Sequence, residues 1–254
     1  MEKAIIYQIF TRLFGNTNTT RKHNGTLTDN GCGKLNAFTP AVLRRIKELG
    51  ATHVWYTGVI RHATTTDYTR YGIPRQHPAV VKGNAGSPYA ITDYYDIDPD
   101  LATNVEKRMN EFESLVKRTH KAGLKMIIDF VPNHVARQYK STAKPKGIAD
   151  FGENDNTGMQ FSPQNNFYYC PEQSFAADID LYHGEELPYE EFPAKATGND
   201  CFGNRPGRND WYETVKLNYG VDYCDAGGVS THFSPTPDTW KKMLDILLFW
   251  AGKG

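Results

Sequence analysis

A carboxylate, a carboxamide and an imidazole accompany a single apolar segment of this 254-residue chain. Asp129 lies within residues 124–131, and Asn133 and His134 follow directly, beyond Pro132. The segment is short, mostly apolar and partly β-branched, which predicts a buried parallel strand. Because parallel sheets carry their sites at the carboxyl ends of the strands, the three polar residues are candidates for binding or catalysis. A structural interpretation stays open, in which Asp129 binds backbone amides, Asn133 closes a turn and His134 is an ordinary polar residue.

Three other segments have the pattern of amphipathic helices. Each begins at a threonine suited to capping and ends at a glycine. Proline follows two of these threonines, and Glu106 has the capping-box spacing after the third, Thr103. The segments run from Thr39 to Gly50, from Thr103 to Gly123 and from Thr236 to Gly252. Their apolar stripes are Val42, Leu43, Ile46 and Leu49; Val105, Met109, Phe112, Leu115 and Val116; and Trp240, Met243, Leu244, Leu247, Leu248 and Ala251.

Strands alternate with these helices along the chain, since residues 4–10 and 52–57 are also strand-like. Such alternation predicts a parallel sheet with right-handed crossovers. We therefore expect an α/β fold: the first part of a (β/α)8 TIM-type barrel, about three βα units, with a large irregular insertion subdomain after the third strand. An open doubly wound sheet is the alternative. The expected parts are residues 1–134 as barrel, 135–235 as the insertion and 236–254 as the third barrel helix, with the sequence stopping before a fourth strand.

The insertion has no sustained helical stripe and is rich in Gly, Asn, Asp and aromatic residues. Roughly a hundred irregular residues are too many for a loop, which predicts a subdomain of its own. Its aromatic residues, such as those in segment 209–212, form either the core of that subdomain or rings on which sugars stack. The Asn/Asp stretch near Asn154 lacks the spacing of a calcium-binding loop, so we expect it to be a solvated loop.

Composition argues against several partners. The net charge is zero, with 29 basic and 29 acidic residues, so the chain lacks the basic field that nucleic acid or an anionic membrane would require. No segment approaches the length of a membrane span. The first ten residues lack a signal core, so we expect a cytoplasmic protein, or a periplasmic or secreted one if a signal was removed. The four cysteines are interpreted as reduced thiols, although Cys170, Cys201 and Cys224 could pair in an oxidising compartment.

Four short segments share a resemblance to one family. They are residues 7–10 (Tyr-Gln-Ile-Phe), 50–57 (Gly-Ala-Thr-His-Val-Trp-Tyr-Thr), 89–95 (Tyr-Ala-Ile-Thr-Asp-Tyr-Tyr) and 129–134 (Asp-Phe-Val-Pro-Asn-His). In this order they resemble the first barrel strand, the second-strand motif, the tyrosine segment and the Asp-x-x-x-Asn-His motif of the α-amylase superfamily of glycoside hydrolases. The insertion lies where that family has its second domain.

The resemblance implies roles for three residues in sugar binding. Tyr89 would supply an aromatic plane at the subsite nearest the scissile bond. His134 would bond a sugar hydroxyl and support charge as the oxocarbenium ion forms, and Asp129 would brace the site from the strand end. The implied ligand is an α-glucan or maltooligosaccharide.

The resemblance also bears on calcium. Asn133 corresponds to a calcium ligand of many α-amylases. Residues 215–218 (Val-Lys-Leu-Asn) resemble the fifth family motif in its neopullulanase and cyclomaltodextrinase form, where Lys216 stands in place of an aspartate ligand. An ammonium cannot ligate calcium but can occupy its place. We expect no cofactor, and calcium at Asn133 is the alternative.

Retaining glycosidases need two carboxyl groups about 5–5.5 Å apart. In the family, the nucleophile, the acid/base and a third acid follow the fourth, fifth and seventh strands, so all three are expected beyond Gly254. No catalytic residue is therefore expected in this chain. Its remaining acidic candidates are expected to be solvated surface: Asp178, Asp180, Glu185, Glu186, Glu190 and Glu191.

The sequence thus predicts the amino-terminal part of a retaining hydrolase for α-1,4-linked glucans, inactive alone. Its open strand edge would require the carboxy-terminal barrel half or self-association. A non-catalytic α-glucan-binding fragment stays open. So does a phosphate-handling enzyme on a small α/β sheet, although no phosphate-binding glycine loop follows a predicted strand. The motifs do not distinguish a hydrolase from a transglycosylase or an isomerase.

Overall fold

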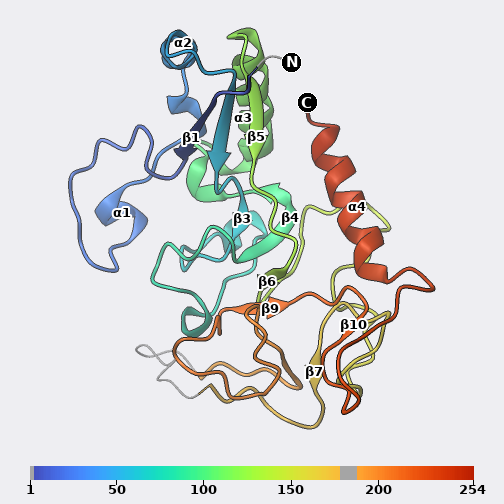
Figure 1. Ribbon diagram of the computed structural model, residues 1–254. Helices are drawn as coiled ribbons and strands as arrows, with labels where there is room; N and C mark the ends of the chain where they lie inside the picture. The colour runs from blue at the N-terminus through green and yellow to red at the C-terminus, as the bar shows by residue number, and fades with distance from the viewer. Residues whose placement is uncertain (1–2, 178–187) are drawn as a thin grey trace.

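The computed structural model describes residues 3–177 and 188–254 and contains a three-stranded parallel sheet, which lies in the upper part of Figure 1. In spatial order its strands are β1 (Ile6–Phe10), β2 (His53–Thr57) and β5 (Lys125–Ile128). The predicted parallel direction of the strands is confirmed. The third strand is shorter than predicted, because its ladder with β2 stops where Ile128 lies opposite Tyr56. One residue further on, the Asp129 side chain accepts a backbone amide instead.

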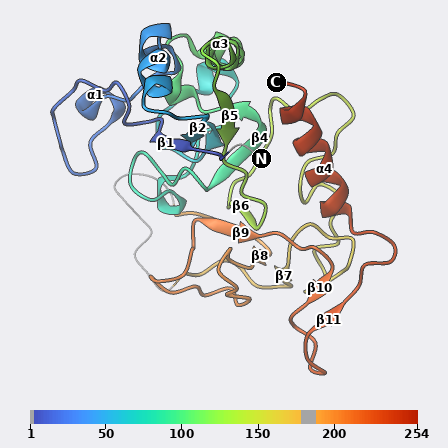
Figure 2. The same cartoon turned by 45° about the horizontal axis from the view of Figure 1, so that its top comes forward.

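Helices α2 (Pro40–Glu48) and α3 (Arg108–Lys121) cover one face of this sheet (Figure 2). Val54 and Tyr56 of β2 pack there against Leu43 and Leu115, and all four side chains are fully buried. α2 begins as predicted, capped by Thr39. Leu49 departs from its predicted stripe and is 71% exposed, because it lies just past the end of the helix.

The start of α3 differs from the prediction. Thr103 does not cap it; residues Val105–Lys107 form a 3-10 turn before the α-helix begins at Arg108. The carboxylate of Glu111 accepts the amides of Thr103 and of the next residue, at 2.9 and 2.7 Å. The side-chain cap of the 3-10 turn is Asn104, whose Oδ1 accepts the Glu106 amide at 3.1 Å, so Asn104 takes the role that was predicted for Thr103.

Helix α4 (Asp238–Ala251) buries a different face from the one predicted. It begins after Pro237 without a side-chain cap, so Thr236 is not its N-cap. Most of the predicted stripe is exposed: Trp240 46%, Leu244 56%, Leu247 46% and Leu248 61%. The buried residues are Thr239, Lys242, Met243 and Ile246. The buried face is therefore partly polar. The hydrogen bonds of Lys242 to the insertion account for the burial of this face.

An antiparallel pair that was not predicted follows β2: β3 (Ile60–His62) and β4 (Ile91–Ile97). It buries charge, because the Arg61 guanidinium pairs with Asp93 at 3.0 Å and with Asp96 at 2.9 Å. Asp93 also accepts the Ser141 hydroxyl at 2.6 Å and the Thr142 amide at 2.8 Å. These bonds join β4 to the first residues of the insertion.

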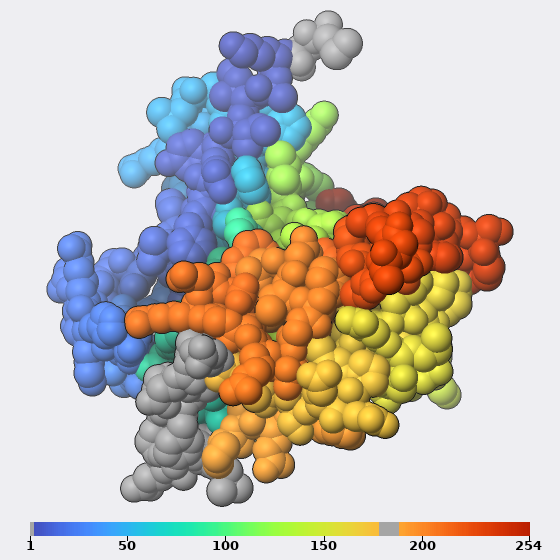
Figure 3. Space-filling model, turned by 60° about the horizontal axis from the view of Figure 1, so that its bottom comes forward, coloured from blue at the N-terminus to red at the C-terminus, as the bar shows by residue number. Residues whose placement is uncertain are grey.

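The insertion lies beyond the carboxyl ends of the central strands and packs beside α4 (Figures 1 and 3). Its paired strands are β6 (His134–Ala136) with β9 (Thr214–Lys216), β7 (Tyr169–Cys170) with β8 (Ala194–Lys195), and β10 (Val221–Asp222) with β11 (Ser230–Thr231). The remaining helical pieces are α1 (Leu27–Asn30) and the 3-10 turns Leu35–Ala37, Thr69–Tyr71, Pro78–Val80 and Pro99–Leu101. All four cysteines are free thiols, as predicted.

Glu191 of the insertion corrects a prediction. Its side chain is 7% exposed and pairs with the Arg137 guanidinium at 2.6 Å, so it is not solvated surface. Burial raises the pKa of Glu191, but Lys195 and Arg137 outweigh it and hold that pKa below its ordinary value. Asp178, Asp180, Glu185 and Glu186 lie outside the described residues.

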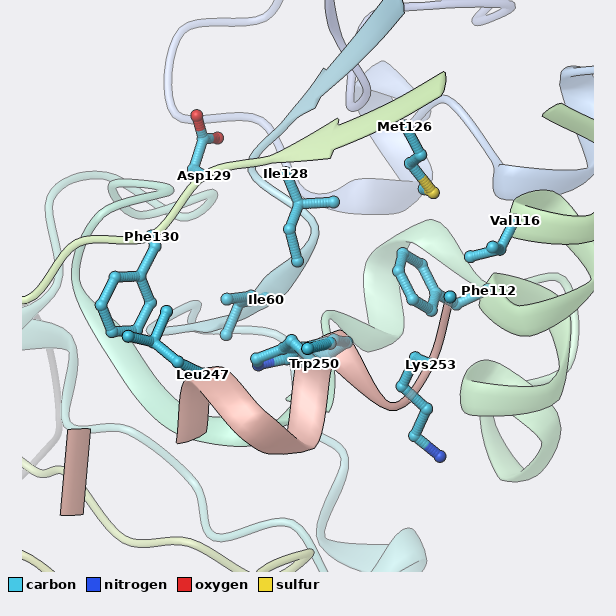
Figure 4. A pocket seen from close by; sticks show the side chains of 12 residues that line it. Ile60, Phe112, Val116, Met126, Ile128, Asp129, Phe130, Leu247, Trp250 and Lys253 are labelled. Atoms are coloured by element: carbon cyan, nitrogen blue, oxygen red, sulfur yellow. The ribbon is translucent and has the colours of Figure 1, made fainter. Parts of the chain in front are cut away.

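An apolar pocket of about 280 Å³ lies between β5 and α4 (Figure 4). Met126, Ile128 and Phe130 line it from the strand side, and Leu247 and Trp250 from the helix side. In the part of the chain that the structure describes, β5 pairs with β2 alone, so its other edge has no strand partner. None of the helices found there has the length and apolar character of a membrane span.

Lys242 fastens α4 to the insertion. Its buried ammonium donates to the Asp150 carbonyl at 2.6 Å and to Asn166 Oδ1 at 2.8 Å, and it pairs with Asp238 at 3.1 Å. Asn166 Nδ2 donates in turn to Asp238 at 3.0 Å and to Thr239 at 3.1 Å. Oxygen atoms of the insertion therefore set the orientation of α4.

We predict that Lys242→Met destabilises the chain although Met is the more apolar residue. The substitution removes the charged donor that the Asp150 carbonyl and Asn166 Oδ1 share and leaves each of these oxygens with one backbone N–H, which costs about 1–3 kcal/mol in the free energy of unfolding. Urea unfolding measures this. Lys241→Met is the matched control, because the neighbouring Lys241 is exposed. An equal midpoint for the two variants would contradict the anchoring role.

Candidate functional site

Asp129 joins the carboxyl ends of β2 and β5. Its Oδ1 accepts the Trp55 indole N–H and its Oδ2 the Gly58 amide, each at 2.6 Å. Burial raises the pKa of Asp129, and the two hydrogen bonds oppose that rise. The carboxylate points to the side of β5 opposite Ile128 and Phe130 (Figure 4). Since each oxygen is held by a fixed donor, Asp129 braces the strand ends and is poorly placed to act as a nucleophile.

Tyr89 lies near Asp129, in the loop that precedes β4. Its side chain is 39% exposed. Partial burial and the charge of Asp129 both raise the pKa of the phenol. The loop closes on Gly58, where an added Cβ would lie 2.9 Å from Cβ of Pro88 and the backbone has φ +77°. Glycine is therefore required at this position for the Tyr89 loop to cover the end of β2.

His134 begins β6 and is 6% exposed. Its ring packs edge-on against Trp211, with centroids 5.3 Å apart, and lies against the backbone of Gly198. Burial, and then the charge of Lys216, lower the pKa of His134 to about 4, against a hydrogen bond to the Tyr89 backbone that raises it. The imidazole is therefore neutral at pH 7: it can bond a hydroxyl, but it brings no positive charge of its own. Its Nδ1 has no hydrogen-bond partner among the described residues.

Lys216 and Asn133, the residues considered around a calcium position, do not form a metal-like cluster with carboxylates. Lys216 lies opposite His134 in the β6–β9 ladder and pairs with Asp200. The Lys216 ammonium also lies 5.2 Å from the centroid of the Tyr223 ring. Asn133 is exposed, and its carbonyl accepts the Leu217 amide at 3.1 Å. Within residues 3–177 and 188–254, no group of three or more His, Cys, Asp or Glu residues is arranged to hold a metal ion.

The structure thus brings Tyr89, Asp129 and His134 to one end of the sheet and leaves the Asn133 side chain outside this group. Sequence analysis missed two contributors. Trp55 lies within the second-strand motif, so the sequence indicated its place on the strand. The sequence did not indicate its hydrogen bond to Asp129. Trp211 belongs to the aromatic segment 209–212, and nothing in the sequence set it apart from the other aromatic residues of the insertion.

Comparison with known proteins identifies the family. The family model described as alpha amylase, catalytic domain, matches residues 8–189, and the chain belongs to the alpha-amylase family. The trehalose-6-phosphate hydrolase of Bacillus subtilis (strain 168) is 32% identical over 139 residues, which are 55% of this chain and 18% of that protein. Maltase A1 of Drosophila melanogaster is 29% identical over 253 residues, 100% of this chain and 33% of the relative. The chain thus spans a third or less of the length of these two relatives.

A solved structure supports the fold. The ligand-free cyclic alpha-maltosyl-(1→6)-maltose hydrolase from Arthrobacter globiformis aligns with a TM-score of 0.50 over 99% of this chain and 42% of that chain, at 17% identity. At this identity the likeness concerns the fold alone. The α/β architecture expected from the sequence is therefore that of a TIM-barrel family.

We predict that Asp129→Asn lowers the free energy of unfolding by about 1–3 kcal/mol, because an amide NH2 would face either the Trp55 or the Gly58 donor. Urea unfolding at pH 7 measures the loss. Asn133→Ala removes an exposed side chain nearby and should stay within about 0.5 kcal/mol of the unmodified chain. A loss for Asp129→Asn no larger than that control would show that the bracing bonds contribute little.

We predict that His134 titrates near pH 4 and that Lys216→Met raises its pKa toward the ordinary 6.5. Because the unfolded state binds a proton at higher pH than the folded state, the free energy of unfolding should fall as pH decreases from 6.5 to 4. NMR titration of the histidine rings reads the pKa directly. Lys146→Met, an equal charge change at an exposed position, should leave it unmoved; a His134 pKa near 6.5 in the unmodified chain would refute the assignment.

Proposed function

We propose that this chain supplies the amino-terminal part of the catalytic (β/α)8 barrel, and the inserted subdomain, of a retaining hydrolase that acts on α-1,4-linked glucans. One observation carries the proposal: Tyr89, Asp129 and His134 lie together at the carboxyl ends of parallel strands, in a chain of the alpha-amylase family. In this proposal residues 1–134 belong to the barrel, residues 135–235 to the insertion and residues 236–254 to the third barrel helix.

The proposed site matches the chemistry of a glucose ring. A sugar presents C–H faces and hydroxyl edges, so it is bound by aromatic planes and by hydrogen-bond partners. Tyr89 offers a partly exposed ring, and the neutral imidazole of His134 has an Nδ1 that is buried without a hydrogen-bond partner. Asp129 holds the surrounding backbone in place through Trp55 and Gly58. These residues would bind and orient the glucan without breaking its bond.

We propose that the two carboxyl groups of the retaining reaction come from residues outside this chain. Such a reaction needs a nucleophile and an acid/base about 5–5.5 Å apart. Asp129 cannot readily serve, because both its oxygens accept hydrogen bonds, and Glu191 is paired with Arg137 inside the insertion. The 254 residues alone should therefore bind glucan without hydrolysing it.

We also propose that the site works without calcium. Calcium prefers a shell of carboxylate and carbonyl oxygens. Lys216 instead places a positive charge beside His134, close to the backbone of Asn133, and takes Asp200 as its partner. This donor set does not suit a divalent cation, so the proposed binding of glucan does not depend on one.

The apolar pocket beside β5 suggests where the rest of the enzyme packs. We propose that a further barrel strand of the same enzyme pairs with the free edge of β5 and covers Met126, Ile128 and Leu247. The family relationship supports this occupant, because the chain matches Maltase A1 along its whole length yet covers 33% of that relative. Self-association through the same edge is the competing outcome.

A non-catalytic α-glucan-binding protein is the second candidate function. The partly exposed rings of Tyr89 and Trp211 support it as they support the hydrolase, because both functions need the same binding surface. The reading frame of the source DNA beyond the codon for Gly254 separates the two. A continuing frame with a Gly-Phe-Arg-x-Asp segment supports the hydrolase, and a stop codon there supports the binding protein.

We predict that the 254-residue chain binds maltoheptaose and releases no reducing ends from it. Isothermal titration should show binding that His134→Ala and Tyr89→Ala weaken at least about tenfold, which corresponds to one good contact each. Reducing-end assays should detect hydrolysis only when the chain is extended into its downstream reading frame. Asn133→Ala serves as the control that keeps full affinity.

Two results would overturn this proposal. Absence of maltoheptaose binding by the folded chain would remove the binding function. Binding that neither His134→Ala nor Tyr89→Ala weakens would place the glucan elsewhere on the molecule. Light scattering of the same samples distinguishes a monomer from self-association through β5.

A further inference from the structure

Trp211 differs from the other tryptophans of the chain. The sequence has four, and three of their indole N–H groups donate to protein oxygens: Trp55 to Asp129, Trp240 to the Tyr219 carbonyl and Trp250 to the Tyr94 carbonyl. The Trp211 indole donates to none of the residues that the structure describes. Its side chain is also 40% exposed. A single exposed aromatic residue is ordinary on a protein surface, so exposure alone carries no argument.

The backbone of Trp211 is held on both sides. Its amide donates to Asn199 Oδ1 at 3.0 Å, and its carbonyl accepts the Thr214 amide at 2.8 Å and the Thr214 hydroxyl at 2.9 Å. Asp210, the preceding residue, accepts the Asn199 side-chain amide at 2.9 Å. The indole is therefore presented from a fixed position, which lowers the entropy lost when a ligand binds against it.

The position of Trp211 gives it a neighbour with a proposed role. Its ring meets His134 edge-on at 5.3 Å, and the His134 ring bonds the backbone of Tyr89. Trp211 thus extends the proposed sugar site from the barrel residues onto the insertion. A glucan held near His134 would therefore lie beside both the Tyr89 segment, through its backbone, and the partly exposed indole of Trp211.

We propose that Trp211 is a substrate-binding residue, which stacks on a glucose unit next to the one bonded by His134 and donates its free indole N–H to a sugar hydroxyl. This inference rests on the proposed function, since it assumes that an α-1,4-linked glucan occupies the His134 site. It adds that the insertion itself contributes to glucan affinity, through an aromatic plane and one donor.

Two substitutions separate the plane from the donor. Trp211→Phe keeps a ring and removes the N–H, and Trp211→Ala removes both. Trp240→Phe is the matched control, because Trp240 is similarly exposed at 46% but lies on α4 with its N–H already bonded. By titration calorimetry with maltoheptaose, Trp211→Ala should bind about tenfold more weakly, the scale of a good aromatic contact, and Trp211→Phe should lie between it and the unmodified chain. Trp240→Phe should be unchanged.

Fluorescence gives a readout that mere packing against His134 would not move. Maltoheptaose should shield tryptophan emission from iodide quenching in the unmodified chain and in Trp240→Phe, and this shielding should disappear in Trp211→Phe. The measurement in the unmodified chain does not depend on whether Trp211→Ala folds. NMR of His134 checks that its pKa stays near 4 in Trp211→Phe, so that any lost affinity belongs to Trp211.

The outcomes distinguish the two proposals. If His134→Ala weakens binding while Trp211→Ala and Trp211→Phe bind normally, Trp211 is not a substrate-binding residue and the proposed function stands. If iodide quenching is unchanged by saturating maltoheptaose, the stacking of Trp211 is refuted in the same way. If the unmodified chain binds no maltoheptaose, both proposals fall.

Discussion

The buried ion pairs of Arg61 with Asp93 and Asp96 hold the parts of this molecule in register. Asp93 is fully buried and also accepts the Ser141 hydroxyl and the Thr142 amide, so one carboxylate ties β4 to the insertion. Removing Arg61 would leave the buried carboxylate of Asp93 without its cation, whereas Asp96 would keep Arg108 at 2.7 Å, so Arg61 is the residue that the cluster cannot lose. The Tyr89 loop precedes β4, and His134 lies between Asp129 and this anchor. The position of His134 is therefore fixed on one side by Asp129 and on the other by the bonds of Asp93 to Ser141 and Thr142.

The central strands and helices could be predicted because their causes are local. The Thr39 side chain caps its helix by accepting the amide of Val42, which is only three residues further along the chain. The alternation of strands with helices can likewise be recognised without knowledge of distant contacts. The buried face of α4 could not be predicted in this way. Lys242 finds its acceptors 76 and 92 residues away, and once its ammonium is bound there, the apolar stripe including Leu244 and Leu248 turns outward. Hydrophobic pattern indicates a helix but not which oxygen atoms it will meet.

The candidate site shows the same division. The spacing of Asp129 and His134 predicted where they lie, because both follow a strand. What surrounds them was not predictable: Asp129 meets Trp55 from 74 residues away, and His134 meets Trp211 only through the insertion. The motif therefore locates the residues, while distant contacts decide their chemistry. The low pKa of His134 is the clearest case, since burial and Lys216 determine it together.

The neutral imidazole of His134 and the neighbouring Lys216 bear on which residues of the proposed enzyme could stabilise a positively charged transition state. The transition state of glycoside hydrolysis is positively charged at the sugar ring, so its stabilisation needs negative charge nearby. His134 adds no positive charge that would oppose it, and the Lys216 ammonium is paired with Asp200. Both carboxylate oxygens of Asp129 already accept hydrogen bonds from the Trp55 and Gly58 N–H groups. In the proposed enzyme, the residues of this chain would provide shape, stacking and hydrogen bonds, and the negative charge for bond cleavage would come from carboxylates placed opposite them.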